Sequence, residues 1–160
     1  MIRLIVEKNI MRVVLQRVRK AKVKIEDTQG DEIGQGILVL LGIEKTDDIE
    51  DVDWLVNKVI NLRIFQDKKG VMNKSLLDVG GELMVVSQFT LMAATKKGNR
   101  PSYIRASNHE HATPLYEYFI QKANTILESN VATGSFGAMM QVTLENDGPV
   151  TFFIDSKQKE

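Results

Sequence analysis

Three polar side chains interrupt a hydrophobic segment in the middle of the sequence. Ser87, Gln88 and Thr90 directly follow the apolar residues 83–86, whose Leu, Met and Val content is typical of a buried strand. Burying a hydroxyl or an amide costs free energy unless the group finds a hydrogen-bond partner. These side chains therefore either bond to neighbouring backbone or face a pocket, and the residues alone leave both interpretations open.

A second unusual feature is Gly148-Pro149, which follows Asn146 and Asp147 near the end of the sequence. Asn-Asp-Gly is typical of a hairpin turn, but Pro lacks the amide donor of a central strand and permits a cis bond. The simpler interpretation is a proline that begins an edge strand, and the residues alone favour it. The alternative is a rigid Gly-cisPro segment whose carbonyl groups face a small ligand.

Positive charge gathers in the least regular stretch of the chain. Lys96, Lys97, Arg100 and Arg105 lie within ten residues, beside Tyr103 and with no acidic residue between them. This composition suits a loop that contacts phosphate groups. A short charged run is more often a solvated loop, so the phosphate contact is a hypothesis.

Other common chemistries find little support in the sequence. His109 and His111 are two residues apart at an expected helix start, so they do not share a helical face. The chain has no Cys, and neither a metal site nor a cofactor is expected. A histidine-dependent hydrolase is not expected from a polar helix cap either. The glycine pairs of the chain do not continue into a nucleotide-binding fingerprint.

The composition fits one globular domain in a reducing compartment. The 160 residues are 43% apolar, and the absence of Cys excludes disulfides. Basic and acidic residues both number 21, so the chain as a whole has no field that attracts DNA or a membrane surface. The apolar run within residues 1–10 is too short to span a bilayer, and a cytoplasmic protein is expected.

The apolar periodicity predicts a single α+β domain with a largely antiparallel, barrel-like sheet and two main helices. The helices are expected from Asp47 or Asp48 to about residue 62, and from Asn108 or Thr113 to about residue 130. Strands are expected at residues 11–18, 21–26, 36–43, 82–86, 138–145 and 150–154. We expect the first three to form an antiparallel meander and the last two to form a hairpin.

Two of these features together resemble the signature of a known family. Ser87-Gln88-Phe89-Thr90 and residues 146–151 resemble the paired motifs of the D-aminoacyl-tRNA deacylases, or D-tyrosyl-tRNA deacylase family. The resemblance continues at residues 16–18, 98–102 and 133–137, and so covers residue 11 to about residue 154. It indicates a deacylase domain at residues 11–156, an N-terminal extension at 1–10 and a polar tail at 157–160.

The resemblance implies a homodimeric enzyme that hydrolyses the ester between tRNA and a D-amino acid, or glycine, without a cofactor. Its partners are the aminoacylated 3′ end of tRNA and a second copy of the chain. Ser87, Gln88, Phe89 and Thr90 would line the pocket of one subunit. Gly148-Pro149 of the other subunit would enter that pocket as a cis dipeptide and reject L-amino acids.

The resemblance leaves two mechanisms open. In one, Thr90 is the nucleophile; in the other, the 2′-hydroxyl of the terminal adenosine assists while the backbone N–H of Phe89 polarises the ester carbonyl. The second is favoured, because the sequence offers no base beside Thr90 and a positioned backbone donor needs none. By the same resemblance, Ala112 lies beside the terminal adenine and Arg17 supports Gly148-Pro149.

The main alternative is a non-catalytic module that binds tRNA or other RNA through the basic residues near Tyr103. Such a module binds charged and uncharged tRNA alike, with strong salt dependence and no turnover. One departure from the family pattern, Met92 in place of a frequent Tyr, leaves the Ser-Gln-Phe-Thr motif intact.

Overall fold

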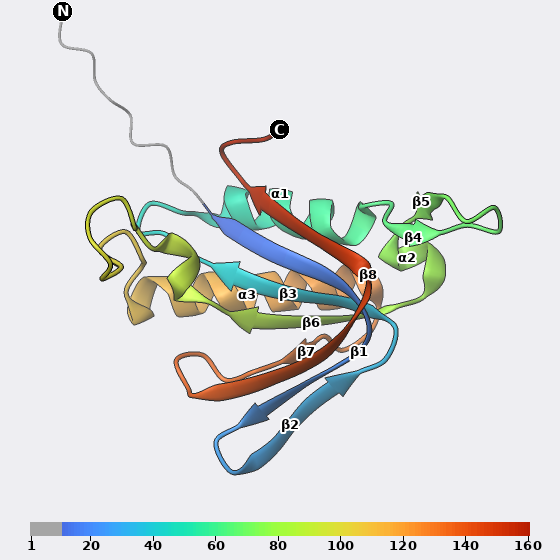
Figure 1. Ribbon diagram of the computed structural model, residues 1–160, viewed down its shortest axis with the longest axis horizontal. Coiled ribbons are helices and arrows are strands. Elements are labelled where there is room, and N and C mark those ends of the chain that lie inside the picture. Colours follow the sequence, from blue (N-terminus) through green and yellow to red (C-terminus); the bar gives the residue numbers. More distant parts are fainter. Residues whose placement is uncertain (1–10) are drawn as a thin grey trace, which may run out of the picture.

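The strand β1 (Arg12–Ile25) organises the sheet, because three other strands pair with it in the computed structural model. The structure describes residues 11–160, and the N-terminal extension expected at residues 1–10 lies outside them. One edge of β1 pairs with β2 (Thr28–Ile33) and β3 (Gly36–Gly42), and the other with β8 (Met140–Asp155). All three run antiparallel to β1 (Figure 1).

The remaining strands make the sheet mixed. β6 (Glu82–Ser87) pairs in parallel with β3, and β7 (Ala132–Thr133) pairs in parallel with β6. The strand order is β2-β1-β3-β6-β7, and a separate small hairpin joins β4 (Phe65–Gln66) to β5 (Met72–Lys74). The α+β, barrel-like fold expected from the sequence is confirmed, with two parallel pairings in a sheet that is otherwise antiparallel.

The expected meander of the first three strands is wrong. Residues 11–18 and 21–26 are parts of one long strand, and the chain turns at Glu26, whose φ is 50°. β2 and β3 then run back along β1 in succession, with a break in the pairing between Ile33 and Gly36. The prediction failed because local alternation shows which residues are extended, and the choice of partner strand depends on packing far along the chain.

The expected closing hairpin is also wrong. Both halves of β8 pair with β1 in the same direction, so the chain does not reverse. Gln16 faces Thr151 and Val18 faces Asn146, which leaves residues 147–150 outside the ladder as a bulge. The turn chemistry of this segment therefore produces a bulge inside a strand.

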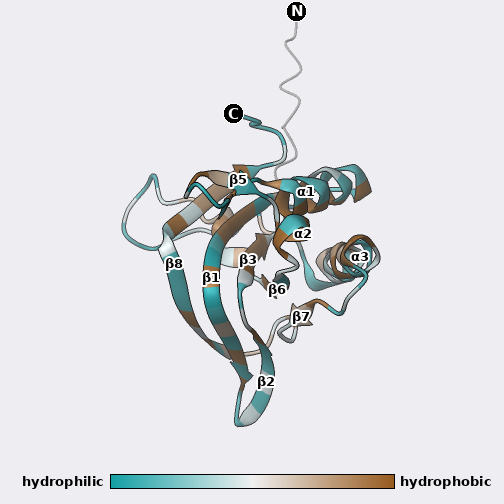
Figure 2. Ribbon diagram, turned by 90° about the vertical axis from the view of Figure 1, so that its right-hand side faces the viewer, coloured by the Kyte–Doolittle hydropathy of each residue, from teal (hydrophilic) through white to brown (hydrophobic). Residues whose placement is uncertain are grey.

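Two long helices cover one face of the sheet (Figure 2). The helices are α1 (Ile49–Asn61), the short α2 (Leu76–Val79) and α3 (His109–Leu127). Asp48 caps α1 in a capping box with Asp51, and Asn108 caps α3 by accepting the His111 amide at 2.9 Å. Thr113 is therefore not the start of the second helix. The short α2 is not among the helices expected from the sequence, and it ends at Gly80 with φ 60°.

Alternate residues of the central strands face two separate apolar clusters. In β6, Leu83 and Val85 pack toward the helices, whereas Met84 and Val86 pack inside the curved sheet. This alternation follows from the two-residue period of a strand and explains why β6 is apolar on both sides. No helix within residues 11–160 is long and apolar enough to cross a membrane.

Candidate active site

A cavity of about 410 Å³ opens where the polar side chains interrupt β6. Its walls come from the ends of β3 and β6, the start of α3, and the segment that leads into β8. Ser87, Gln88, Phe89 and Ala112 all line it, so the structure brings four of the predicted site residues together. These elements meet on the left side of the domain in Figure 1.

The end of β6 continues directly into the short 3-10 helix η1 (Phe89–Met92). The Gln88 amide donates to the Leu41 carbonyl oxygen at 2.7 Å, which prolongs the parallel pairing with β3 by one residue. Gln88 is the N-cap residue of η1 and makes no side-chain hydrogen bond to its first turn. Within the described residues, no side chain therefore caps the amides of Phe89 and Thr90 that begin η1, and Phe89 lines the cavity.

Thr90 does not line the cavity, unlike its neighbours. Its hydroxyl oxygen accepts a short hydrogen bond from the side-chain amide of Gln88. Within residues 11–160, no carboxylate or imidazole hydrogen-bonds to Thr90. Since a threonine hydroxyl needs a base to become a nucleophile, the geometry offers it no activation.

The opposite wall of the cavity is the first turn of α3. Ala112 is only 3% exposed, and its methyl group leaves room at this wall. One turn earlier, His109 also lines the cavity, with its Nδ1 3.3 Å from the Thr113 hydroxyl. Sequence analysis missed His109 at this site, although its three-residue spacing from Ala112 places both on one helical face. His111 points elsewhere, and its Nε2 lies 2.9 Å from the Asp47 carbonyl oxygen.

Aromatic rings flank the cavity on both sides. Phe89 is 57% exposed and packs edge to face on Tyr103, with ring centroids 5.1 Å apart. Phe136 packs edge to face on His109 at the same centroid distance and lies 5.6 Å from Tyr116. The Tyr116 hydroxyl donates to Val85 at 2.8 Å, and burial raises the pKa of Tyr116 to about 12. Tyr116 therefore anchors the Phe136 wall as a neutral donor.

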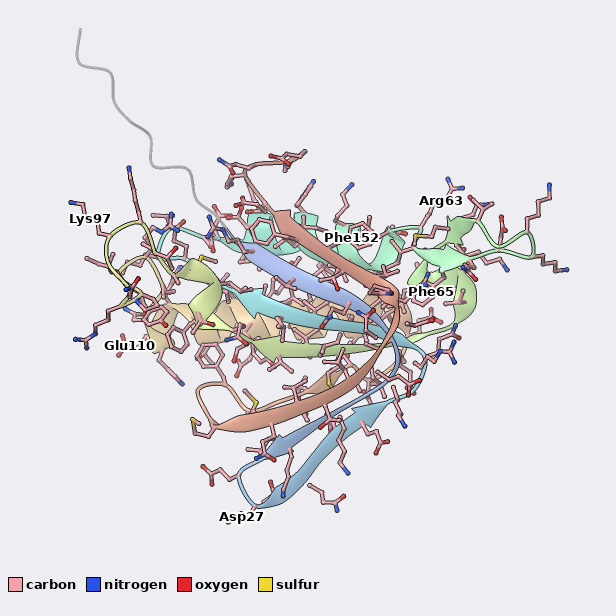
Figure 3. The ribbon with its side chains drawn as sticks, viewed as in Figure 1. Asp27, Arg63, Phe65, Lys97, Glu110 and Phe152 are labelled. Carbon is pink, nitrogen blue, oxygen red and sulfur yellow. The ribbon has the colours of Figure 1, made fainter. Side chains whose placement is uncertain are left out.

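The basic loop, residues 96–105, lies on the same side of the domain as the first turn of α3, which lines the cavity. Lys96, Lys97 and Arg100 are exposed, and Figure 3 shows Lys97 projecting away from the domain on the side of Glu110, which belongs to the first turn of α3. Arg105 differs, because its guanidinium faces the Glu44 carboxylate at 4.0 Å. All four cations were predicted to contact phosphate, but Arg105 is half-buried whereas the other three are exposed.

The Gly148-Pro149 bond is cis, and both residues are exposed. They lie in the bulge of β8, and neither residue lines the cavity. The bend of β8 lies at the right of Figure 1, opposite the ends of β3 and β6. Arg17 is 5% exposed and donates from Nε to the Asp147 carbonyl oxygen at 2.8 Å and from Nη1 to that of Ile64 at 2.6 Å. The structure thus places Arg17 against the bulge, and it does not bring the bulge to the cavity of its own chain.

No group of three or more His, Asp or Glu side chains in the described part of the chain has the geometry to hold a metal ion. The arrangement can instead offer amide donors, a carboxamide and a closed apolar wall to a small ligand. That set suits stabilisation of a developing oxyanion by backbone groups.

Comparisons with known proteins place the same residues in one family. A family model described as D-Tyr-tRNA(Tyr) deacylase matches residues 14–155. The D-aminoacyl-tRNA deacylase of Azobacteroides pseudotrichonymphae genomovar. CFP2 is 58% identical over 150 residues, which cover 94% of this chain and all of the relative. The D-aminoacyl-tRNA deacylase of Bacteroides thetaiotaomicron is 56% identical over the same shares of each chain.

Two solved structures have the same fold. The c-Myc DNA unwinding element binding protein superposes with a TM-score of 0.83 and 40% identity, over 89% of this chain and 97% of that chain. A probable eukaryotic D-amino acid tRNA deacylase superposes with a TM-score of 0.79 over 91% and 99% of the two chains. The second is only 18% identical, so it supports the fold alone.

Proposed function

The chain belongs to the D-Tyr-tRNA(Tyr) deacylase family and is a D-aminoacyl-tRNA deacylase, and we propose that its cavity holds the aminoacylated 3′ end of tRNA. The observation that carries this proposal is the meeting of uncapped η1 amides, Ser87 and Gln88 with the small Ala112 wall in one cavity. The cavity then takes an aminoacyl group at the amide end and the terminal adenine at Ala112.

The proposed reaction is hydrolysis of the ester without a protein nucleophile. Water adds to the ester carbonyl, and the N–H of Phe89 donates to the oxyanion that forms. The bond to the ribose 3′ oxygen then breaks, the 3′-hydroxyl leaves with a proton, and the D-amino acid is released as a carboxylate. The 2′-hydroxyl of the terminal adenosine assists the proton transfer, because within residues 11–160 the Thr90 hydroxyl bonds to the Gln88 amide, which is not a base.

Positioned amide donors are sufficient to make this mechanism effective. Removal of one oxyanion donor from an enzyme typically costs about 100-fold to 1000-fold in rate, so one or two amides supply a large share of catalysis. The amides of η1 belong to a 3-10 turn between β6 and the loop that carries the basic residues, and the Leu91 amide donates to the Gln88 carbonyl oxygen at 3.2 Å.

We propose that a second copy of the chain completes the site. Gly148-Pro149 lies away from the cavity of its own chain, so it reaches a cavity only in a partner subunit. A two-fold homodimer provides this exchange twice, because the same surfaces meet on both subunits. The exposed Phe152 and Phe153 follow the bulge and supply apolar area for that contact. In this arrangement the dipeptide rejects L-amino acids, whereas glycine on tRNA has no side chain to reject and is also hydrolysed.

The exposed cations of the basic loop fit the same substrate. Lys96, Lys97 and Arg100 are exposed, and Lys97 projects from the domain on the side of Glu110, in the first turn of α3 (Figure 3). The phosphates next to the 3′ end would lie on this side. We propose that they add affinity for tRNA without selecting its amino acid, in the cytoplasm where aminoacyl-tRNA is used. Arg105, paired with Glu44, is expected to contribute less.

The test is turnover of D-Tyr-tRNA by the purified protein, measured beside its binding to uncharged tRNA. The proposal predicts release of D-Tyr with multiple turnovers. Equal, salt-sensitive binding of charged and uncharged tRNA with no release of D-Tyr would instead identify an RNA-binding module, which the exposed cations also suit.

A further inference from the structure

We propose that Asn146 is the positioning residue that fixes Gly148-Pro149 and thereby sets selectivity between D- and L-amino acids. This inference rests on the proposed function, in which the dipeptide excludes L-amino acids. Asn146 pairs with Val18 at the edge of the β8 bulge and does not line the cavity, so it acts through the dipeptide.

Residues 147–150, which form the bulge, make no ladder pairs with β1. Two steps along β1, from Gln16 to Val18, correspond to five steps along β8, from Thr151 back to Asn146. The residues between them therefore cannot pair with β1. Exposed backbone groups that leave a ladder can bond to water, whereas the buried groups of Val150 need a partner within the protein.

Asn146 provides those partners at the closing end of the bulge. Its Oδ1 accepts from the Val150 amide at 2.8 Å, and its Nδ2 donates to the Val150 carbonyl oxygen at 3.1 Å. One side chain therefore satisfies both backbone groups of Val150, as a neighbouring strand would. Val150 is only 7% exposed, so these bonds form at the buried base of an otherwise exposed bulge.

The other contacts of the bulge hold its opening end. Arg17 donates to the Asp147 carbonyl oxygen, and the Asp147 carboxylate lies 3.5 Å from Nε of both Arg17 and Arg19. Arg19 is 70% exposed, so its ion pair is weakly held in solvent. The residue after Pro149 is bonded by Asn146 instead. Gly148-Pro149 is thus fixed between an arginine on one side and a carboxamide on the other.

The two hydrogen bonds between Asn146 and Val150, which we call the clasp, require a donor and an acceptor on one short side chain. Asn offers a carbonyl oxygen and an NH₂ group, whereas ionised Asp offers acceptors alone and Ala offers neither. Asn146→Asp therefore keeps the bond from the Val150 amide and loses the bond to the Val150 carbonyl. Asn146→Ala loses both, which gives a graded pair of variants.

The experiment compares Asn146→Asp and Asn146→Ala with wild type and with Thr151→Val as a matched control. Thr151 follows Val150, and its hydroxyl accepts from Nε2 of Gln16 at 3.2 Å and from Nδ2 of Asn146 at 3.5 Å. Thr151→Val therefore removes a hydroxyl beside Asn146 while both bonds from Asn146 to Val150 stay in place. The first measurement is hydrogen exchange of the Val150 amide, with the β3 amides as a reference for global opening. The second is the ratio of D-Tyr-tRNA to L-Tyr-tRNA deacylation rates.

We expect exchange at Val150 to rise by about tenfold or more in Asn146→Ala, with β3 unchanged and Asn146→Asp intermediate. The D-to-L ratio should fall by about tenfold or more in Asn146→Ala, mainly because L-Tyr-tRNA is accepted, and Thr151→Val should stay within about twofold of wild type. An unchanged exchange rate at Val150, or an unchanged D-to-L ratio despite faster exchange, overturns the inference. A wild type that shows no D preference refutes the proposed function instead, and the exchange result still tests the clasp.

Discussion

At the scale of single residues, the hydroxyl of Thr90 distinguishes the two mechanisms, with and without a protein nucleophile. It accepts from the Gln88 side chain and has no base beside it within the described residues. We therefore predict that Thr90→Val retains activity within about tenfold of wild type, since the oxyanion donors are backbone groups. Single-turnover rates on D-Tyr-tRNA measure this. A nucleophilic Thr90 would instead make the loss about 1000-fold or larger.

Ala112 sets the width of the cavity at the end where the terminal adenine is proposed to bind. A phenylalanine at this position would fill space that the methyl group leaves open, since Ala112 is 3% exposed and lines the cavity. Ala112→Phe should lower the rate by about 100-fold or more at subsaturating substrate. Ala112→Gly, which keeps the cavity open, is the control and should retain activity. Equal rates for Ala112→Phe and wild type would show that the terminal adenine does not bind beside Ala112.

Asp47 predicts an unusual pH dependence of stability. It is 2% exposed, and burial, with added repulsion from Asp51 and Glu44, raises its pKa from 3.8 to about 7. Between these values the native state holds a proton that the unfolded chain has released, so the free energy of unfolding falls as pH rises through this window. Stability from this group is complete below pH 3.8 and is lost by about pH 7.

Asp47→Asn stays neutral and keeps an oxygen to accept the Glu44 amide, which Asp47 binds at 2.6 Å. Near pH 4 its free energy of unfolding should be close to that of wild type, and near pH 8 it should be higher by roughly 4 kcal/mol, because the pKa difference spans about three units. Urea titrations at several pH values measure this difference. A difference that stays constant from pH 4 to pH 8 would contradict the raised pKa.

At the scale of elements, the bulge of β8 is the feature that turns a strand into part of a site. A Cβ added at Gly148 would lie 2.6 Å from Cγ2 of Val150 and closer still to its amide nitrogen. Gly148→Ala should therefore displace the dipeptide and lower the D-to-L ratio of deacylation by about tenfold. Because Gly148 is exposed, thermal stability should change little. A variant with the wild-type ratio would show that this segment does not control selectivity.

Helices and buried strands could be predicted at this scale, but their partners could not. Asp48 and Asn108 marked both helix starts through local capping chemistry, and the apolar run of β6 marked a buried strand. The turn at 146–149 was assigned from equally local chemistry and became a bulge. A polar glycine-proline segment can reverse the chain or form a bulge, and the neighbouring strand decides which. Here that strand is β1, which lies more than a hundred residues earlier in the sequence.

Only part of the candidate site could be predicted, because some of its residues are brought together by tertiary packing. Ser87, Gln88 and Phe89 are consecutive, so a polar break in one strand was enough to find them, and Ala112 came from the family resemblance. His109 reaches the cavity only because α3 packs with its first turn beside the end of β6. That packing is a tertiary fact that neither composition nor periodicity contains.

At the scale of the whole molecule, the Gly148-Pro149 bulge does not line the cavity of its own chain. The bend of β8 lies at the right of Figure 1, and the ends of β3 and β6 that line the cavity lie at the left. The proposed union of the bulge and the cavity across a homodimer predicts complementation between two defective chains. In a heterodimer of one Ala112→Phe chain and one Gly148→Ala chain, the cavity of the Gly148→Ala chain is open and receives the intact dipeptide of its partner. Differently tagged subunits allow this heterodimer to be purified.

The heterodimer should deacylate D-Tyr-tRNA at about half the wild-type rate, because one of two sites is intact, and should keep the wild-type D-to-L ratio. Each homodimeric variant serves as its control and should lack either rate or selectivity. If the dipeptide instead served the cavity of its own chain, no site in the heterodimer would have both parts. Selective activity would then be absent.

The most direct test of the whole account is the pair of deacylation rates of the wild-type protein on D-Tyr-tRNA and L-Tyr-tRNA, measured under the same conditions. A cavity that binds the ester through backbone amides and excludes one hand of the amino acid predicts rapid release of D-Tyr, with L-Tyr-tRNA spared by about 100-fold or more. Equal rates on the two substrates, or no release from either, would contradict it.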